Sequence, residues 1–148
     1  MLQAPKSKAC FPHCFVVSGQ YEVPDDHSVH RVTPLWCAAV AGKVRVVECL
    51  VKHGADVNSV SDTGSTPVRS ACYMTHFDIV KVLVAHAADI QKPNHNGGTC
   101  LINSVQSEEL CEFLLKNGAE VNAQDYQQKT ALHYAIQECR SELKHAYF

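Results

Sequence analysis

Apolar residues recur at helical spacing in three separate stretches of the chain. Val44, Val47 and Val51 form the first such stripe, and the same spacing returns twice further along. A stripe of apolar residues three and four positions apart is typical of an amphipathic helix that buries one face. The pattern therefore predicts three helices, over about 44–53, 77–86 and 107–116.

A threonine marks the start of a repeated unit. The marker is spaced by 33, 33 and then 31 residues, at Thr33, Thr66, Thr99 and Thr130. A threonine hydroxyl can accept a hydrogen bond from a free backbone N–H at a helix start, and a following proline is tolerated at the first helical position. Each threonine therefore predicts a short first helix that precedes the second helix of its unit, at about 34–41, 67–73, 100–104 and 131–138.

A second marker ends each unit in the same register. The endings read G-A-D-V at 54–57, A-A-D-I at 87–90 and G-A-E-V at 118–121. Glycine suits the left-handed residue that closes a helix. The acidic residue recurs once per unit, which predicts a structural role in the turn rather than a catalytic pair, for Asp56, Asp89 and Glu120.

The third and fourth units depart from this pattern. Two residues are missing from the third unit between Asn103 and Leu110, so we expect either a shorter turn between its helices or a shift in their phase. The fourth unit reaches Phe148 partway through its second helix, and its last stretch, 140–148, offers no polar cap. We therefore expect three full units and an incomplete fourth.

The period of 33, the T-P-L-W-C-A-A start at 33–39 and the G-A-D-V-N ending at 54–58 resemble the ankyrin repeat. The resemblance implies an all-α solenoid of helix–turn–helix repeats with short hairpin-like turns. Residues 1–30 carry no repeat marker, and we expect an irregular or finger-like N-terminal arm there. The expected units span about 31–63, 64–96, 97–127 and the incomplete 128–148.

Composition narrows the class of protein. The chain has 148 residues, 46% hydrophobic and 19% charged, which is enough for one folded domain. Its 13 basic and 15 acidic residues give a net charge of −2, which speaks against a nucleic acid or an anionic membrane as partner. No apolar run reaches the ~18 residues of a membrane span. Pro12 and His13 interrupt the apolar N-terminus, which speaks against a secretory signal, so we expect a protein of the cytoplasm, with the nucleus as an alternative. We also expect a monomer.

Eight cysteines are the unusual feature of the composition. Five stand at apolar or small positions of the predicted helices, where a thiol acts as a small hydrophobic group: Cys37, Cys49, Cys72, Cys100 and Cys111. Cys10, His13 and Cys14 resemble part of a metal site, but a structural zinc needs four ligands and no second close pair exists. We predict no metal and no cofactor. Because no nucleophile signature or phosphate loop is present, we also predict that the chain is not an enzyme.

Some sequence blocks of the repeats are more specific than the general ankyrin pattern. The L-W-C run at 35–37 and the S-T-P-V-R-S-A-C block at 65–72 resemble the Fem (feminisation) family, and the resemblance covers about 31–138. Proteins of that family are ankyrin-repeat substrate receptors of cullin-RING ubiquitin ligases. The resemblance implies that the concave groove binds the C-terminal degron of a protein, which is then ubiquitinated and degraded by the proteasome. The family's cullin-docking segment has no counterpart here, so a cullin scaffold is expected as partner only with such a segment.

Three residues match groove positions of that family: Trp36, Ser65 and Arg69. Tyr73 stands where the family has a phenylalanine, and we take these four residues as the candidate peptide-binding site. The resemblance implies that Trp36 and Tyr73 give rigid apolar area to a peptide tail. It also implies that Arg69 pairs with a carboxylate and that Ser65 donates a hydrogen bond. Where the family has an acidic F-D-G turn, this chain has Y-M-T at 73–75, so that acidic partner for a basic degron residue is missing.

Other interpretations stay open. The length is similar to that of the small four-repeat inhibitors of cyclin-dependent kinases, which bind one folded partner. A truncated, non-functional isoform is a further alternative, because about three repeats are the minimum for a stable stack. At single positions, Trp36 can pack on neighbouring first helices and Arg69 can be a solvated concave residue, while His133 is expected to hydrogen-bond within its own turn.

Overall fold

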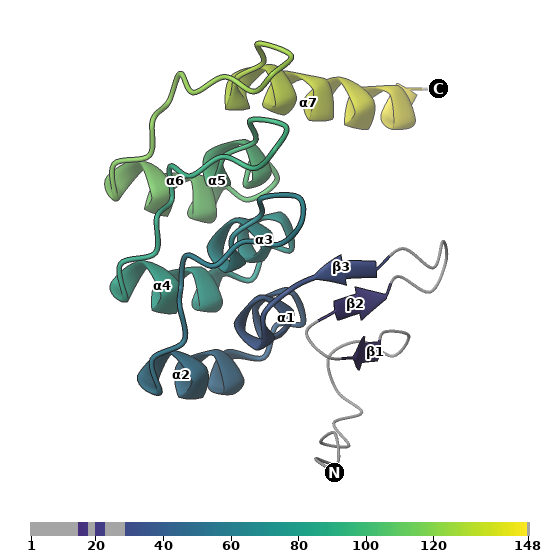
Figure 1. The fold of residues 1–148 in the computed structure, drawn as a ribbon. Coiled ribbons are helices and arrows are strands. Elements are labelled where there is room, and N and C mark those ends of the chain that lie inside the picture. The colour runs from purple at the N-terminus through teal and green to yellow at the C-terminus, as the bar shows by residue number, and fades with distance from the viewer. Residues whose placement is uncertain (1–14, 18–19, 23–28, 148) are drawn as a thin grey trace.

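The computed structural model describes residues 15–17, 20–22 and 29–147, and Figure 1 shows how they are arranged. Three short strands precede seven helices in this part of the chain. The strands are β1 (Phe15–Val17), β2 (Gln20–Glu22) and β3 (Val29–Arg31). The helices are α1 (Pro34–Val40), α2 (Val44–Lys52), α3 (Pro67–Tyr73), α4 (Phe77–Ala85), α5 (Cys100–Asn103), α6 (Glu108–Lys116) and α7 (Ala131–Tyr147).

The strands form one antiparallel sheet in the order β1-β2-β3. The described part of the arm is therefore a small sheet, and the all-α description applies to the repeats. The three possible metal-binding residues of the arm, Cys10, His13 and Cys14, lie outside the described residues. Among those that the structure describes, no three His, Cys, Asp or Glu residues are grouped so that they could hold a metal ion.

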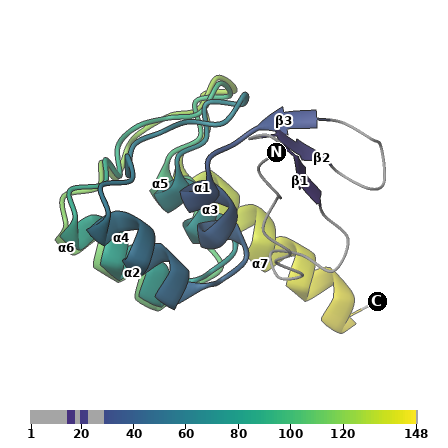
Figure 2. The same ribbon diagram turned by 60° about the horizontal axis from the view of Figure 1, so that its bottom comes forward.

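The helices stack in pairs and form two layers. The first helices α1, α3 and α5 make one layer, the first-helix layer, and the second helices α2, α4 and α6 make the other (Figures 1 and 2). α7 packs on α5 and continues the first-helix layer. The segments that join successive pairs project together to one side of the stack (Figure 2).

Threonine caps begin the first helices, as the sequence predicts. The Thr33 hydroxyl accepts a hydrogen bond from the backbone N–H of Trp36 at 3.2 Å. The same bond recurs at the starts of α3 and α5, where Thr66 and Thr99 are the capping residues. A side-chain cap of this kind stabilises a helix by about 1 kcal/mol.

The apolar core runs along the stack between the two layers. Leu35 of α1 and Val68 of α3 are 1% and 0% exposed, and Leu83 of α4 and Leu110 of α6 are also fully buried. Each unit buries these side chains against its own partner helix and against the neighbouring units. The stack is therefore stabilised by contacts between neighbours rather than by one central core.

Cysteine burial follows the prediction at four of the five repeat positions. Cys37, Cys72 and Cys100 are buried, and Cys111 is half-buried. The prediction is wrong for Cys49, which is exposed on α2. Val47 and Val51 of that helix face the core, and a residue midway between them lies on the opposite, solvated side of a helix.

Polar side chains tie each unit to the next. The side chain of Asn58 donates to the Ala87 carbonyl at 3.4 Å and accepts from the backbone N–H of Asp89 at 2.8 Å. One unit later Gln91 takes the same position and donates to the Gly118 carbonyl at 2.6 Å. These bonds keep successive units in one register along the stack.

Several residues predicted to be structural have that role. A carboxylate oxygen of Asp56 accepts the backbone N–H two residues further on at 2.9 Å, and Asp89 does the same at 2.9 Å. At the start of α7, Nδ1 of His133 lies 2.9 Å from the Thr130 hydroxyl. The predictions for these two aspartates and for the histidine are therefore confirmed.

The third unit is shorter than the others in its first helix rather than in the turn between its helices. α5 has four residues where α1 and α3 have seven each. The connection to α6, 104–107, is longer than the corresponding 41–43 and 74–76. The prediction of a shorter turn is therefore wrong, because the first helix is the part that is cut. The Ser104 hydroxyl donates to the Leu101 carbonyl at 2.9 Å and ends α5 early.

α7 also departs from the prediction. A short helix at 131–138 and the beginning of a second helix at 140–148 were expected, whereas one helix of 17 residues runs from Ala131 to Tyr147. In the first two units a left-handed residue follows the first helix, Gly42 with φ 69° and Thr75 with φ 56°. No glycine or proline interrupts α7, so the helix continues. No helix among the described residues is long and apolar enough to cross a membrane.

Candidate functional site

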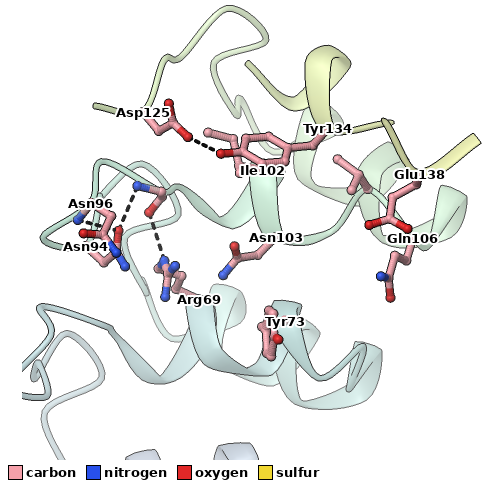
Figure 3. A pocket seen from close by; sticks show the side chains of 12 residues that line it. Arg69, Tyr73, Asn94, Asn96, Ile102, Asn103, Gln106, Asp125, Tyr134 and Glu138 are labelled. Carbon is pink, nitrogen blue, oxygen red and sulfur yellow. Dashed lines mark hydrogen bonds between the residues drawn. The ribbon is translucent and has the colours of Figure 1, made fainter. Parts of the chain in front are cut away.

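A cavity of about 420 Å³ opens in the first-helix layer between α3, α5 and α7 (Figure 3). Its walls come from these helices and from the turns that precede α5 and α7. Its size suits a small ligand or the end of a peptide. Among its polar and charged side chains are Arg69, Asn94, Asn96, Asn103, Gln106 and Glu138.

The shortened α5 explains why the cavity is there. The last turn that α1 and α3 possess is absent from α5, which ends at Asn103. Tyr73 of α3 and Glu138 of α7 line the space from the two neighbouring helices (Figure 3). Nδ2 of Asn103 is buried in this wall, and it has no hydrogen-bond partner in the part of the chain that the structure describes.

Two hydrogen bonds fix the guanidinium of Arg69 on the α3 wall. Nε donates to the Gly98 carbonyl at 2.9 Å, and Nη1 donates to Oγ of Ser65 at 2.8 Å. A guanidinium has five N–H donors, so three remain. Burial lowers the pKa of Arg69, but a guanidinium keeps its charge at neutral pH.

No carboxylate among the described residues forms an ion pair with Arg69. Its Nη2 has no hydrogen-bond partner within the same residues. The side chain is half-buried and lines the cavity. The α3 wall therefore presents a fixed, partly desolvated positive charge that lacks an anionic partner.

Ser65 lies behind Arg69 rather than on the cavity wall. It is 4% exposed, and its Oγ lies 3.0 Å from Oγ of Ser70 in addition to accepting from Arg69. The family resemblance implied a direct hydrogen bond from Ser65 to a peptide. The geometry instead makes Ser65 a positioning residue that holds the guanidinium of Arg69.

The turn before α5 brings the backbone close to Arg69. Oδ1 of Asn94 accepts the backbone N–H of Asn96 at 3.1 Å and that of Gly98 at 2.8 Å (Figure 3). A Cβ atom at Gly98 would lie 3.0 Å from Nη2 of Arg69 and 3.2 Å from Oδ1 of Asn94. Glycine at this position therefore lets the guanidinium approach the turn.

Asp125 and Tyr134 form the wall on the side of α7 (Figure 3). The Tyr134 hydroxyl donates to Asp125, which also accepts the backbone N–H groups of Gln127 and Lys129 at 2.9 Å each. Burial by itself would raise the pKa of Asp125, but these hydrogen bonds outweigh it and lower the pKa below its usual value. The bond to the carboxylate raises the pKa of Tyr134. The pair is therefore a carboxylate and a phenol at neutral pH.

The remaining predicted residues are Tyr73 and Trp36. Tyr73 lines the cavity and is 70% exposed. Trp36 is half-buried on α1, one unit before Arg69 at the same repeat position, and is not part of this cavity wall. The structure thus brings Ser65, Arg69 and Tyr73 together and leaves Trp36 on the neighbouring helix of the same layer.

Sequence reasoning missed the cavity residues that lie towards the end of the stack. A polar position that recurs in successive units of the sequence could have indicated two of them. Ser61, Asn94 and Asp125 occupy the same position of successive units, and each accepts the backbone N–H four residues further on. Glu138 is not part of this repeated pattern. The missed residues are Asn94, Asn96, Gly98, Ile102, Asn103, Val105, Gln106, Asp125, Tyr134 and Glu138.

Comparison with known families decides what kind of stack this is. The sequence profile described as ankyrin repeats, in three copies, matches residues 13–94 and 89–145, which is more than half of the chain. The chain belongs to the ankyrin-repeat family. The predicted ankyrin-repeat solenoid is therefore confirmed, and the chain is a protein-binding module of a family that is typically not enzymatic.

Two curated relatives match parts of this ankyrin protein. A fem-1 homologue of Drosophila melanogaster is 48% identical over 42 residues, which are 28% of this chain and 6% of that protein. A putative ankyrin repeat protein of fowlpox virus (strain NVSL) is 29% identical over 113 residues, which are 76% of this chain and 15% of that protein. The chain thus spans a small share of the length of either relative. The first match is consistent with a Fem resemblance over part of the chain.

Proposed function

We propose that this ankyrin protein binds the C-terminal peptide of a partner protein in the cavity between α3, α5 and α7. We propose further that it is the substrate-recognition part of a cullin-RING ubiquitin ligase, which directs the bound protein to the proteasome. The peptide site rests on the geometry of Arg69. The link to a ligase rests on the Fem resemblance, so the two parts need separate experiments.

The peptide site is inferred from the positive charge of Arg69, which has no anionic partner within the described part of the chain. Removing a charge from water is costly unless an opposite charge or hydrogen bonds replace the solvent. Two of its donors are used by Ser65 and Gly98, and the side chain lines the cavity. A carboxylate can accept two parallel hydrogen bonds from a guanidinium, which makes a peptide C-terminus a fitting ligand.

The other walls suit the main chain of a peptide. Asn96, Asn103 and Gln106 each carry both a donor and an acceptor, as peptide bonds do. The exposed ring of Tyr73 adds rigid apolar area at the rim of the cavity. Glu138 lies away from Arg69 along the cavity and favours a basic side chain in the bound peptide (Figure 3).

The proposed role in ubiquitination rests on sequence similarity. The L-W-C and S-T-P-V-R-S-A-C blocks that resemble the Fem family contain Trp36 of α1 and Arg69 of α3. The match to the fly fem-1 homologue supports the same relationship over 42 residues. This role would place the protein in the cytoplasm or the nucleus, where such ligases act.

Peptide binding can be tested with an array of C-terminal peptides, each synthesised with a free carboxylate and as the amide. Amidation should weaken binding by about tenfold or more, because it removes the charge that pairs with Arg69. Fluorescence anisotropy with the best peptide should show a similar loss for Arg69→Gln. The control Arg45→Gln removes an exposed charge from α2 and should leave binding unchanged. Equal binding of amidated and free peptides would contradict the proposal.

The ligase role needs an experiment in cells. A reporter protein that ends in the best peptide should fall in abundance when the ankyrin protein is expressed with it at its natural full length, and proteasome inhibition should restore it. Arg69→Gln should abolish the effect, whereas Arg45→Gln should not. Stable reporter levels, together with intact peptide binding in vitro, would refute the ligase role and leave the peptide site standing.

A further inference from the structure

The face of α7 that points away from the cavity carries exposed apolar side chains. Leu132 is 68% exposed and Ile136 is 51% exposed. Cys139, one turn further along, is exposed as well. Tyr134 and Glu138 lie on the other side of the same helix, where they line the cavity. One face of α7 is therefore used by the cavity, and the opposite face has no partner among the described residues.

The preceding units show what normally covers this face. The positions equivalent to Leu132 are Leu35, Val68 and Leu101, which are 1%, 0% and 5% exposed. In each of those units the first helix packs on a second helix, namely α1 on α2, α3 on α4 and α5 on α6. The short connections make each pair antiparallel (Figure 1). The interface that continues along the stack thus calls for an antiparallel helix beside α7.

The spacing of the exposed residues indicates a helix of the same kind as α7 itself. Leu132, Ile136 and Cys139 are separated by four and then three positions, and the next step of four falls on 143, which is a leucine in the sequence. An alternation of four and three is the spacing of the apolar seam in a two-helix coiled coil. No charged residue occupies any of these seam positions. The seam can therefore pair with a copy of itself.

We propose that two copies of this chain associate through α7, antiparallel and about a two-fold axis. In this arrangement position 132 faces position 143 of the second copy, and position 136 faces position 139. A two-fold axis across a helix makes the pair antiparallel, so the second copy supplies the helix direction that α2, α4 and α6 supply in their units. The apolar seam of each copy is covered by the other copy in this arrangement.

The proposed dimer goes beyond the peptide-binding function and does not depend on it. It differs from the monomer expected from the sequence, because Leu132 and Ile136 of α7 are exposed in the structure. The cavity stays open in the dimer, since Tyr134 and Glu138 lie on the other face of the helix. Each copy can therefore bind its own peptide.

Sedimentation of the full chain over a range of concentrations tests the proposal. We expect a dimer that dissociates on dilution, and Ile136→Lys should weaken it by about tenfold or more because the charge enters the seam. Gln137→Lys places the same charge on the adjacent, exposed position outside the seam and should leave the dimer intact. Circular dichroism melts would verify that both variants fold. A chain that is monomeric at all concentrations, or a dimer that Ile136→Lys does not weaken, overturns the proposal.

A short bis-maleimide, which joins two thiols at close range, tests the geometry. Cross-linked dimers should form in the unmodified chain and in Cys49→Ser, because that exposed cysteine lies on α2, away from the seam. They should be lost in Cys139→Ser. Loss in Cys49→Ser, or undiminished cross-linking in Cys139→Ser, would show that the copies meet through another surface and would overturn the α7 pairing.

Discussion

The first two units and the last two follow the same repeat but complete it to different degrees. In the first two, both first helices have seven residues and both second helices have nine. In the last two, the first helices have four and 17 residues. The regular half buries its apolar positions, whereas the irregular half leaves a cavity and an exposed apolar face.

The regular half mainly stabilises the fold, whereas the irregular half forms the candidate binding surfaces. Leu35 and Val68 in the regular half pack fully, so changes there act on folding. The shortened α5 opens the space beside Arg69, and α7 supplies Tyr134 and Glu138 to its wall. In this solenoid the candidate binding surfaces therefore arise where the repeat deviates from its own pattern.

The largest expected difference is in the free energy of unfolding, when the same repeat position is truncated in the regular half and in the irregular half. Leu35→Ala empties a position that is 1% exposed and should lower the free energy of unfolding by ~2–5 kcal/mol. Leu132→Ala alters the equivalent position, 68% exposed, and should change it by less than ~0.5 kcal/mol. Urea denaturation at dilute concentration measures both. Equal destabilisation by the two variants would mean that the fourth unit is packed like the others.

A substitution in the turn before α5 should affect binding more than folding. The Cβ atom of Gly98→Ala would lie 3.0 Å from Nη2 of Arg69 and should displace the guanidinium. We expect binding of a peptide with a free C-terminus to weaken by about tenfold. Anisotropy titration measures the affinity, and a melting curve shows whether the fold survives. Unchanged affinity in a folded variant would remove Arg69 from the binding site.

A smaller effect is expected at the turn between the helices of the second unit. Thr75 has φ 56°, a left-handed conformation that is costly for a branched residue, whereas the equivalent Gly42 has φ 69° at no such cost. Thr75→Gly should therefore stabilise the fold by about 1 kcal/mol. The reverse change, Gly42→Thr, should destabilise it, since a Cβ there lies 2.9 Å from Cε1 of His76. Melting temperatures that move in the opposite directions would refute this account of the turn.

The smallest effect concerns pH. Hydrogen bonds hold the pKa of Asp125 below its usual 3.8, so they contribute stability that is present above pH 3.8 and is lost as the pH falls through the lower pKa. The loss should be about 1 kcal/mol or less. Asp125→Asn copies Asn94 of the preceding unit and should remove this part of the acid dependence. Urea denaturation at a series of acidic pH values measures it, and an unchanged profile in the variant would exclude Asp125 as the source.

The regular features of the fold follow directly from residue spacing. Thr33 and Thr66 predict the helix starts because a hydroxyl cap is a local interaction. The repeat pattern predicted a turn near residue 139. The local sequence has no glycine or proline that would end the helix there, so the continuous α7 was not predictable from the repeat. The exposure of Cys49 shows the same limit, since a small apolar residue at a helix position does not reveal which face is solvated.

The candidate site was predictable only in part. Arg69, Ser65 and Tyr73 lie together because the spacing of four residues places them on one side of the start and body of α3. The opposite wall comes from positions more than fifty residues further along, such as Asp125 and Glu138. Those residues line the same cavity as Arg69 beside the short α5, and the length of α5 depends on where the stack absorbs two missing residues.

If the shortened α5 creates the peptide site, restoring the length of that helix should close the site. Two alanines inserted after Asn103 bring the unit back to the 33-residue spacing and should extend α5 into the cavity. Anisotropy titration with a peptide that has a free C-terminal carboxylate should then show binding weakened by about tenfold or more, while the melting temperature is unchanged or higher. A folded insertion variant that binds the peptide as tightly as the parent chain would contradict the account.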